Sequence, residues 1–141
     1  MATNYLVEQL SPVQLPLVNK FYQQQRARSK AKGNERVYVT RRKLQIIAAA
    51  RLADISACCF LTGVQVDNHY QRQGVAKTLL TAMLNDLTES CYTFPYQHLT
   101  GFYQQLGFVE LAQQELPLPL QQRFVRYRGQ GRDIVAMRFG D

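Results

Sequence analysis

The chain has 141 residues, 46% of them hydrophobic and 19% charged, as is usual for a globular protein large enough to bury one core. No apolar run approaches the roughly 20 residues needed to cross a bilayer. The N-terminus has neither the basic start nor the apolar stretch of a secretory signal. We therefore expect a cytoplasmic protein with no membrane contact. The formal net charge of +7 suits anionic partners, whether nucleic acid, anionic lipid or a phosphate-bearing cofactor, and does not choose among them.

The cysteines and histidines match no disulfide or metal pattern. Cys58, Cys59 and Cys91 are three in number and two are adjacent, so they cannot make a disulfide framework. The two histidines, His69 and His98, do not stand at a zinc-ligand spacing. We therefore predict no metal, and we expect the cysteines to be small buried apolar residues.

The first part of the chain predicts a strand, a helix and a basic loop. Residues 5–7 have the composition of a short strand. Ser11 followed by Pro12 is typical of a helix N-terminus, and apolar residues at helical spacing extend that helix to about Arg28. The stretch 26–36 is basic and polar and contains a Gly-Asn turn signal, so we expect an exposed loop there.

Three β-like runs follow, at 37–39, 46–52 and 57–66. The last two are joined by a short polar turn at 54–56, as in an antiparallel meander. Gly63, inside the last run, indicates a bulge or a close backbone approach.

The second half of the chain alternates helices and strands. The spacing of apolar residues predicts an amphipathic helix from Gly74 to about Leu87. A strand at 91–94 ends at Pro95, and a short helix follows with Gly107 as its C-cap. The remaining elements are two strands and a helix with Leu120 and Phe124 facing inward, at 108–111, 134–139 and within 117–129. The whole predicts one α+β domain around a mostly antiparallel sheet with helices packed on it.

The most informative segment runs from Val64 to Ala76, out of a strand, through a polar turn and into a helix at Gly74. The backbone N–H groups of such a turn, with the first free amides of the helix, form a concave anion site. The helix dipole adds favourable potential, so a phosphate or pyrophosphate is the natural ligand. Gly74 lets the ligand approach the backbone closely, and the small side chain of Ala76 keeps that approach open.

At this segment the chain resembles the GNAT N-acetyltransferase superfamily. The family signature, Gln/Arg-x-x-Gly-x-Gly/Ala after a strand and before a helix, is matched by Gln71-Arg72-Gln73-Gly74-Val75-Ala76. A second stretch, Phe102-Tyr103-Gln104-Gln105-Leu106-Gly107-Phe108, is similar to the late helix-to-strand motif of the family. Either motif alone can be read as a tight connection or as core residues with a C-cap. Two motifs in the right order and context are much more specific.

The resemblance implies a GNAT-like acyl-CoA N-acyltransferase fold over residues 1–141, with a mostly antiparallel mixed sheet of six to seven strands flanked by helices. It implies direct transfer of an acetyl group from acetyl-CoA to a primary amine, without a metal. The implied cofactor-binding residues of the turn, whose amides hold the pyrophosphate, are Gln71, Arg72, Gln73, Gly74, Val75 and Ala76. The implied partners of the pantetheine arm, one of whose N–H groups polarises the thioester carbonyl, are Val64, Gln65 and Val66.

The resemblance also implies a catalytic acid. Tyr103, four residues before Gly107, stands where the family has a tyrosine that protonates the departing thiolate. The alternative is a core aromatic residue with one hydrogen bond. The base that takes the amine proton has four candidates by residue type, which are Glu35, Asp67, His69 and His98. We take His98, just ahead of the Tyr103 helix, as the candidate base, with a helix cap as its alternative role.

Two features bear on the acceptor and the cofactor. Many family members carry an Asn near the start of the late helix that contacts the pantetheine, and residues 99–101 (Leu99, Thr100 and Gly101) offer none. The N-terminal acceptor region is basic here, with Arg26, Arg28, Lys30, Lys32 and Arg36. An acidic or phosphorylated acceptor fits this region, and so does a solvated basic loop. The same alternatives apply to a second basic cluster, made of Arg123, Arg126, Arg128 and Arg132.

Two other functions stay open. One is a GNAT-fold module that binds acyl-CoA without turnover. The other is a basic nucleic-acid-binding domain, which we rank last because the basic residues are spread between loops and no known RNA-binding motif is present. The acceptor of an enzyme would be a small amine, an amino acid, a peptide N-terminus or a lysine, which the sequence does not name. A homodimer through sheet edges or C-terminal strands is compatible with the sequence.

Overall fold

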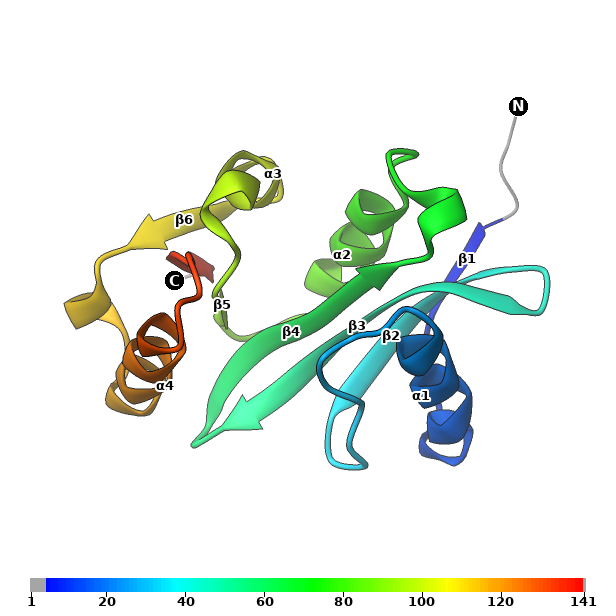
Figure 1. Ribbon diagram of the computed structural model, residues 1–141, viewed down its shortest axis with the longest axis horizontal. Coiled ribbons are helices and arrows are strands. Elements are labelled where there is room, and N and C mark those ends of the chain that lie inside the picture. Colours follow the sequence, from blue (N-terminus) through cyan, green and yellow to red (C-terminus); the bar gives the residue numbers. More distant parts are fainter. Residues whose placement is uncertain (1–4, 141) are drawn as a thin grey trace. The chain divides into compact units, whose positions relative to one another are not determined.

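The computed structural model describes residues 5–140 (Figure 1). Two compact units make up the chain. The first contains the residues up to Ala53 together with Thr62–Asp86, and the second contains Asp54–Leu61 together with the residues from Leu87 onward.

Seven strands form a mixed sheet in the order β1-β2-β3-β4-β5-β7-β6. The β4–β5 pair is parallel, and the pairs β1–β2, β2–β3, β5–β7 and β6–β7 are antiparallel, which confirms the predicted mixed and mostly antiparallel sheet. The strands are β1 (Tyr5–Gln9), β2 (Arg36–Arg42), β3 (Gln45–Ile55), β4 (Cys58–Val66), β5 (Cys91–Thr93), β6 (Phe108–Leu111) and β7 (Ala136–Phe139). The α-helices are α1 (Leu15–Gln24), α2 (Val75–Asn85), α3 (Thr100–Gln105) and α4 (Leu118–Gly129).

The first unit carries a helix on each face of its strands (Figure 1). In β2, Val37 and Val39 lie in a buried cluster with Phe21 of α1. Tyr38, between them, points to the opposite face because side chains alternate along a strand. Its hydroxyl donates a hydrogen bond of 3.0 Å to Asp86, directly after α2. The alternation along β2 therefore decides which face each helix covers.

The helix predicted after Ser11 begins later than expected. Ser11 and Pro12 open a single 3-10 turn, Pro12–Gln14, and α1 follows from Leu15. Pro16 is tolerated in the first turn of α1 because its missing N–H would have no intrahelical acceptor there.

The same helix also ends at Gln24, short of the predicted end near Arg28. Arg26 has a φ of +58°, and the N–H groups of Arg26 and Ala27 bond back to the carbonyls of Gln23 and Tyr22 at 3.1 and 3.0 Å. This is the Schellman arrangement, which usually has glycine at the left-handed position. Because an arginine occupies it here, the sequence carries no stop signal.

The turn between β3 and β4 is tighter than the predicted turn at 54–56. Ser56 and Ala57 form it with φ values of +51° and +69°. Two successive residues with positive φ are typical of a two-residue hairpin turn, which Asn-Gly usually fills. Since neither Ser56 nor Ala57 is Asn or Gly, the polar composition of residues 54–56 placed the predicted turn too early in the sequence.

The second unit is built on an aromatic cluster under α4. Leu120 and Phe124 of α4 are buried with Phe60, as predicted for the two α4 residues. The Phe94 ring lies edge-on to the rings of Phe60 and Phe124, with centroid distances of 4.8 and 5.0 Å. The predicted strand at 134–139 is shorter, because Ile134 makes only an isolated bridge to Tyr96 before β7 begins.

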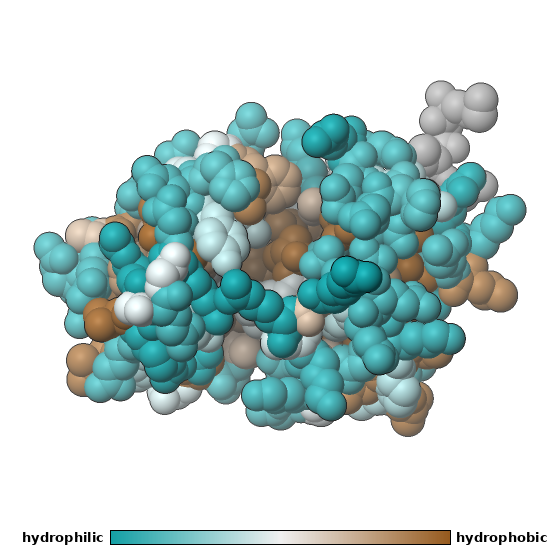
Figure 2. All heavy atoms as spheres, in the orientation of Figure 1, coloured by the Kyte–Doolittle hydropathy of each residue, from teal (hydrophilic) through white to brown (hydrophobic). Residues whose placement is uncertain are grey.

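Cys59 and Cys91 are buried, as predicted, and Cys58 is half-buried. Within residues 5–140 no helix has the length and apolarity to span a membrane. The face drawn in Figure 2 is mostly hydrophilic.

Candidate active site

Gly74 separates the polar turn from α2, as predicted. Its φ is +77°, and α2 begins at the next residue, Val75. A Cβ added at Gly74 would meet no atom within 4 Å, so the space beside it is open. The first N–H groups of α2 have no intrahelical acceptor, and Gly74 has no side chain that could cap them. This is an open helix N-terminus, the geometry that binds phosphate.

Side chains of the turn itself hold it in shape. The Asp67 carboxylate accepts a hydrogen bond of 2.8 Å from the N–H of His69. Gln71 Nε2 donates to the carbonyl of Val66 at 3.2 Å, and Gln73 Nε2 donates to the carbonyl of His69 at 3.1 Å. The two glutamine side chains therefore brace the backbone of the turn.

The turn is also attached to the neighbouring strands of the first unit. The Tyr70 ring lies edge-on to the Tyr5 ring of β1, with centroids 6.4 Å apart. Arg42 Nη1, at the end of β2, donates to the Tyr70 hydroxyl at 3.1 Å. Arg72, two residues before Gly74, has an exposed side chain, so it adds a positive charge on the turn that favours an anion there.

Val64, Gln65 and Val66 form the end of β4, directly before the turn. The parallel register of β4 with β5 consists of Cys59–Cys91 and Phe60–Tyr92, so this pairing does not engage residues 64–66. The N–H of Asp67 donates to the carbonyl of Ile47 in β3 at 2.8 Å, which fixes the end of β4 to β3.

Gly63 confirms the predicted irregularity of β4. Its φ is +68°, and a Cβ added there would lie 2.5 Å from Nη1 of Arg51. The Tyr22 hydroxyl of α1 donates to the Gly63 carbonyl at 2.7 Å. A side chain from β3 and another from α1 thus converge on this one residue of β4.

Arg51 is the residue of this region that the sequence analysis missed. It is only 3% exposed. Its Nε lies 3.1 Å from Glu35 Oε1, its Nη2 donates to Ser29 Oγ at 2.8 Å, and its guanidinium lies 5.0 Å from the centroid of the Tyr22 ring. The available signal was a single arginine inside the apolar run 46–52.

Three of the candidate bases have ionic or hydrogen-bonding partners within the first unit. Glu35 pairs with Arg51 and also accepts the backbone N–H of Lys32 at 2.8 Å. The backbone hydrogen bond from His69 is the largest cause that lowers the pKa of the Asp67 carboxyl, so Asp67 is a weak proton acceptor at neutral pH. The His69 side chain is 89% exposed, and its Nδ1 lies 3.0 Å from Asp67 Oδ1.

Tyr103 lies in the second unit, on α3, and is 5% exposed. Its ring lies edge-on to Phe102 and Phe108, with centroid distances of 5.2 and 5.5 Å. Burial, with a smaller effect from Cys91, raises the pKa of its phenol to about 12. The phenol is therefore protonated at physiological pH and can act as a donor.

His98 also lies in the second unit, on a short 3-10 helix, Gln97–Leu99, ahead of α3. Its side chain is exposed, and its ring stacks on Tyr96 with centroids 6.2 Å apart. The N-cap position of α3 is Leu99, and no side chain caps that helix. The alternative role of His98 as a helix cap is therefore wrong.

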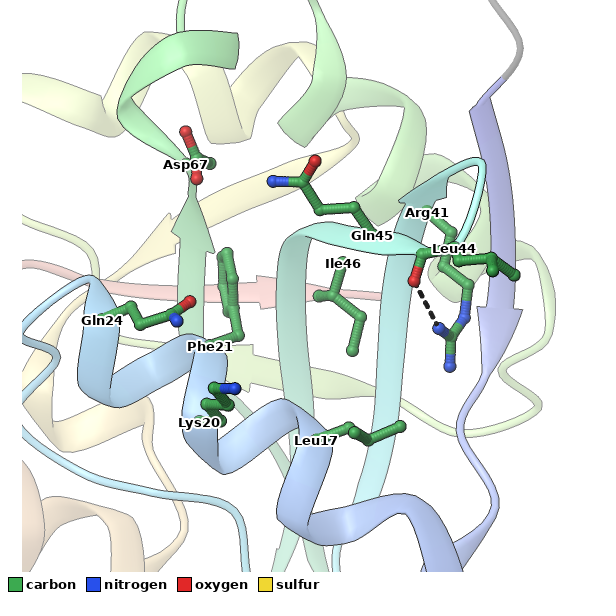
Figure 3. Close-up of a pocket in the computed structure, with 9 residues that line it drawn as sticks. All are labelled: Leu17, Lys20, Phe21, Gln24, Arg41, Leu44, Gln45, Ile46 and Asp67. Carbon is green, nitrogen blue, oxygen red and sulfur yellow. Dashed lines mark hydrogen bonds between the residues drawn. The ribbon is translucent and has the colours of Figure 1, made fainter.

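Two pockets open along α1 in the first unit. The smaller one, of about 340 Å³, is lined by α1, by residues from Arg41 to Ile46 and by Asp67. Figure 3 shows Lys20 of α1 and Asp67 at the end of β4 among its lining side chains. The larger pocket, of about 700 Å³, lies between α1 and the loop that follows it. No cluster of three or more His, Cys, Asp or Glu in residues 5–140 could hold a metal ion.

The fold is that of solved acetyltransferases. N-acetylglutamate synthase from Neisseria gonorrhoeae, complexed with coenzyme A and N-acetyl-glutamate, superimposes with a TM-score of 0.72 at 13% identity, over 99% of this chain and 35% of that chain. The chain thus spans about a third of the length of that synthase. The ribosomal-protein-S18-alanine N-acetyltransferase from Escherichia coli gives 0.67 at 18% identity, over 96% and 92% of the two chains. The PaiA N-acetyltransferase from Thermoplasma acidophilum, in complex with coenzyme A, gives 0.62 at 11% identity, over the whole of both chains.

The family follows from the sequence. Residues 6–116 match the family model described as an acetyltransferase (GNAT) domain. The chain therefore belongs to the GNAT acetyltransferase family, transferases whose acyl donor is acetyl-CoA. No curated protein matches the sequence significantly.

Proposed function

We propose that residues 1–141 act as one catalytic domain that transfers the acetyl group of acetyl-CoA to a primary amine by direct attack. The observation that carries this proposal is the open N-terminus of α2, where Gly74 faces empty space. The proposal places the enzyme in the cytoplasm, gives it a small amine or a peptide amine as acceptor, and is compatible with a homodimer.

The open N-terminus of α2 and the uncapped amides beside it support the first unit as the acetyl-CoA site. The amides from Gln71 to Ala76 would hold the pyrophosphate, which is the role that their geometry favours. The main-chain groups of residues 64–66, outside the parallel register with β5, would pair with the extended pantetheine arm. When bound, acetyl-CoA supplies an acyl group activated as a thioester.

In the proposed reaction, the bond from the amine nitrogen to the acyl carbon forms as the carbon–sulfur bond breaks. The surplus proton of the amine passes to a base or to water, and the sulfur leaves as a thiolate that accepts a hydrogen bond from the Tyr103 hydroxyl and is then protonated to the thiol by water. Because the pKa of Tyr103 is raised to about 12, complete proton transfer to a thiolate is uphill. We therefore assign Tyr103 a hydrogen bond that strengthens as negative charge develops on sulfur.

We propose His98 as the group that takes the amine proton. It is exposed and precedes Tyr103 on the same unit, so it can pass the proton on to water. Glu35 and Asp67 are less suited because one is paired with Arg51 and the other has a lowered pKa.

The second candidate function is an acyl-CoA-binding module without turnover. The observation that favours it is that three of the four candidate bases, Glu35, Asp67 and His69, already have ionic or hydrogen-bonding partners. It predicts the same cofactor binding and no transfer to any amine.

Thiol release from acetyl-CoA in the presence of an amine panel tests the proposal. For Tyr103→Phe we expect kcat to fall by roughly 10²- to 10⁴-fold, with acetyl-CoA affinity unchanged because the ring still packs on Phe102 and Phe108. Full activity of Tyr103→Phe would contradict the assigned acid. Acetyl-CoA binding without thiol release on any amine would favour the module.

A further inference from the structure

We propose that the pocket between α1 and the loop 25–35 binds the acceptor, and that the acceptor is an amine that also carries a carboxylate or phosphate group. This inference rests on the proposed transferase function, because it names the class of its second substrate.

The lining of this pocket is cationic. Lys20 from α1 and Arg28 and Lys30 from the loop line it, together with polar and small residues, and the described lining contains no acidic side chain. Its volume of about 700 Å³ lies within the usual range for small-ligand pockets. A carboxylate or phosphate is the group that several convergent cations bind best.

The loop that carries these cations is held in place, which distinguishes it from a solvated basic loop. Asn19 of α1 makes two hydrogen bonds to the backbone of Ala31, from Nδ2 to the carbonyl at 3.1 Å and from the Ala31 N–H to Oδ1 at 2.7 Å. Ala31 is only 3% exposed. Ser29 and Glu35 hold the buried Arg51 guanidinium. Arg28 and Lys30 therefore project from a backbone that is fixed on both sides of them.

The pocket also adjoins the strand that would carry the thioester. Tyr22 lines the pocket, and its hydroxyl donates to the carbonyl of Gly63 in β4 at 2.7 Å. One aromatic side chain thus separates the pocket from β4, one residue before the stretch 64–66. The pocket and the residue that precedes 64–66 are therefore both in contact with Tyr22.

The charge of Glu35, the one acidic residue of the loop 25–35, does not neutralise the pocket. Glu35 Oε1 lies 3.1 Å from Nε of Arg51, and its side chain is 9% exposed. Its charge is matched by Arg51, so the positive charges of Lys20, Arg28 and Lys30 remain available to a ligand.

Matched pairs of amines, which differ only in the anionic group, test the inference. The pairs are 4-aminobutyrate with 4-aminobutyramide, O-phosphoethanolamine with ethanolamine, and the dipeptide amides Glu-Ala-NH2 with Gln-Ala-NH2. We expect kcat/KM to be about tenfold or more higher for the anionic member of at least one pair. The first and second pairs separate a carboxylate preference from a phosphate preference.

Two double variants of the loop 25–35 test whether the cations of the pocket cause the preference for the anionic amine. Arg28→Gln with Lys30→Gln removes two pocket cations, and Arg26→Gln with Lys32→Gln removes two exposed cations of the loop that do not line the pocket. The pocket variant should lose the preference for the anionic member, and the control variant should keep it. Both should retain the stabilisation by acetyl-CoA, because neither touches the 71–76 turn.

Each outcome has a distinct meaning. Equal rates for both members of every pair would overturn the inference and leave the transferase proposal standing. The same holds if both variants lose the preference for the anionic member to the same extent. If no amine is acetylated, the same anionic amines should still raise the unfolding midpoint of the CoA-loaded protein, and less so in the pocket variant. Absence of that shift would also overturn the inference. Absence of any response to acetyl-CoA would instead refute the proposed function itself.

Discussion

Arg51 connects four separate segments of the first unit through one side chain. Its guanidinium contacts Glu35 and Ser29 of the loop, Tyr22 of α1 and Gly63 of β4. A buried charge of this kind is stable only while its partner is present, because the desolvation of an arginine is large. Nη1, the atom closest to Gly63, is buried with no hydrogen-bond partner in the described part of the chain. Glu35 is therefore the main ionic partner of this cation.

Replacing Glu35 with Ala should lower the free energy of unfolding by about 3–5 kcal/mol, because Arg51 stays buried without its counter-charge. The matched control is Glu8→Ala, which removes the ion pair with Arg41 at the more exposed Glu8 and should cost less than about 1 kcal/mol. Urea denaturation measures both. Equal losses for the two variants would contradict the role given to the Arg51 pair.

The ionisation of Tyr22 should make the free energy of unfolding depend on pH in the alkaline range. Burial raises the pKa of its phenol to about 12, against the lowering effect of Arg51. In the unfolded chain the same phenol loses its proton near pH 10. The contribution of Tyr22 to the free energy of unfolding is therefore complete below pH 10. It falls by roughly 1.4 kcal/mol for each pH unit between 10 and 12, because the unfolded chain then releases a proton that the folded chain keeps. The Tyr22→Phe variant should show a shallower loss over this interval in chemical denaturation. The exposed Tyr96→Phe is the control, and an unchanged slope for Tyr22→Phe would contradict the account.

At the scale of the elements, backbone conformation shapes the turn between β4 and α2, the surface that we propose binds acetyl-CoA. Gly74 adopts a φ of +77° directly before α2, which turns the chain and leaves the first amides of the helix facing open space. A larger residue could adopt this φ at a cost of about 1–2 kcal/mol. Its side chain would then occupy the space that a phosphate needs.

The variant Gly74→Ala should therefore lose about 1–2 kcal/mol of stability and most of its affinity for acetyl-CoA. Gly131→Ala separates the two effects, because Gly131 also has a positive φ of +88° with nothing near its Cβ, and lies in the second unit. It should be destabilised to a similar extent and bind acetyl-CoA normally. Denaturation and cofactor titration measure the two quantities, and normal binding by Gly74→Ala would contradict the assignment of the turn.

The elements that sequence predicted well are those with standard signals. The strand 108–111 and the helix starting after Gly74 have clear patterns and lie where expected, and Gly107 with its φ of +104° follows α3 as predicted. The end of α1 and the β3–β4 turn were misplaced because Arg26, Ser56 and Ala57 take positive φ values that usually belong to Gly or Asn. Tertiary contacts impose these conformations, and local composition does not reveal them.

The backbone conformation of the candidate site was predictable in part. The turn at 71–76 depends on local backbone geometry, so its motif located it. The contact between Arg51 and Gly63 joins residues distant along the chain, and no periodicity within either strand indicates it. The sequence showed the basic loop but could not show that Asn19 and Arg51 fix it in place.

At the scale of the whole molecule, positive charge is distributed unevenly. Twelve of the 17 Lys and Arg residues lie in the first unit, with four of the ten Asp and Glu residues, and the second unit contains the remainder. The first unit therefore carries the whole net positive charge, and it also holds the 71–76 turn and the cationic pocket. Such a field attracts anionic ligands at low ionic strength and weakens as salt is added.

The proposed function depends on the binding of acetyl-CoA at the N-terminus of α2. Thermal unfolding with acetyl-CoA, CoA and ATP at matched ionic strength tests it most directly. A ligand at about 100 times its Kd that binds only the folded state adds roughly 2.7 kcal/mol, so acetyl-CoA and CoA should raise the midpoint clearly, and ATP should raise it little. No rise with millimolar acetyl-CoA, or an equal rise with ATP, would contradict the claim.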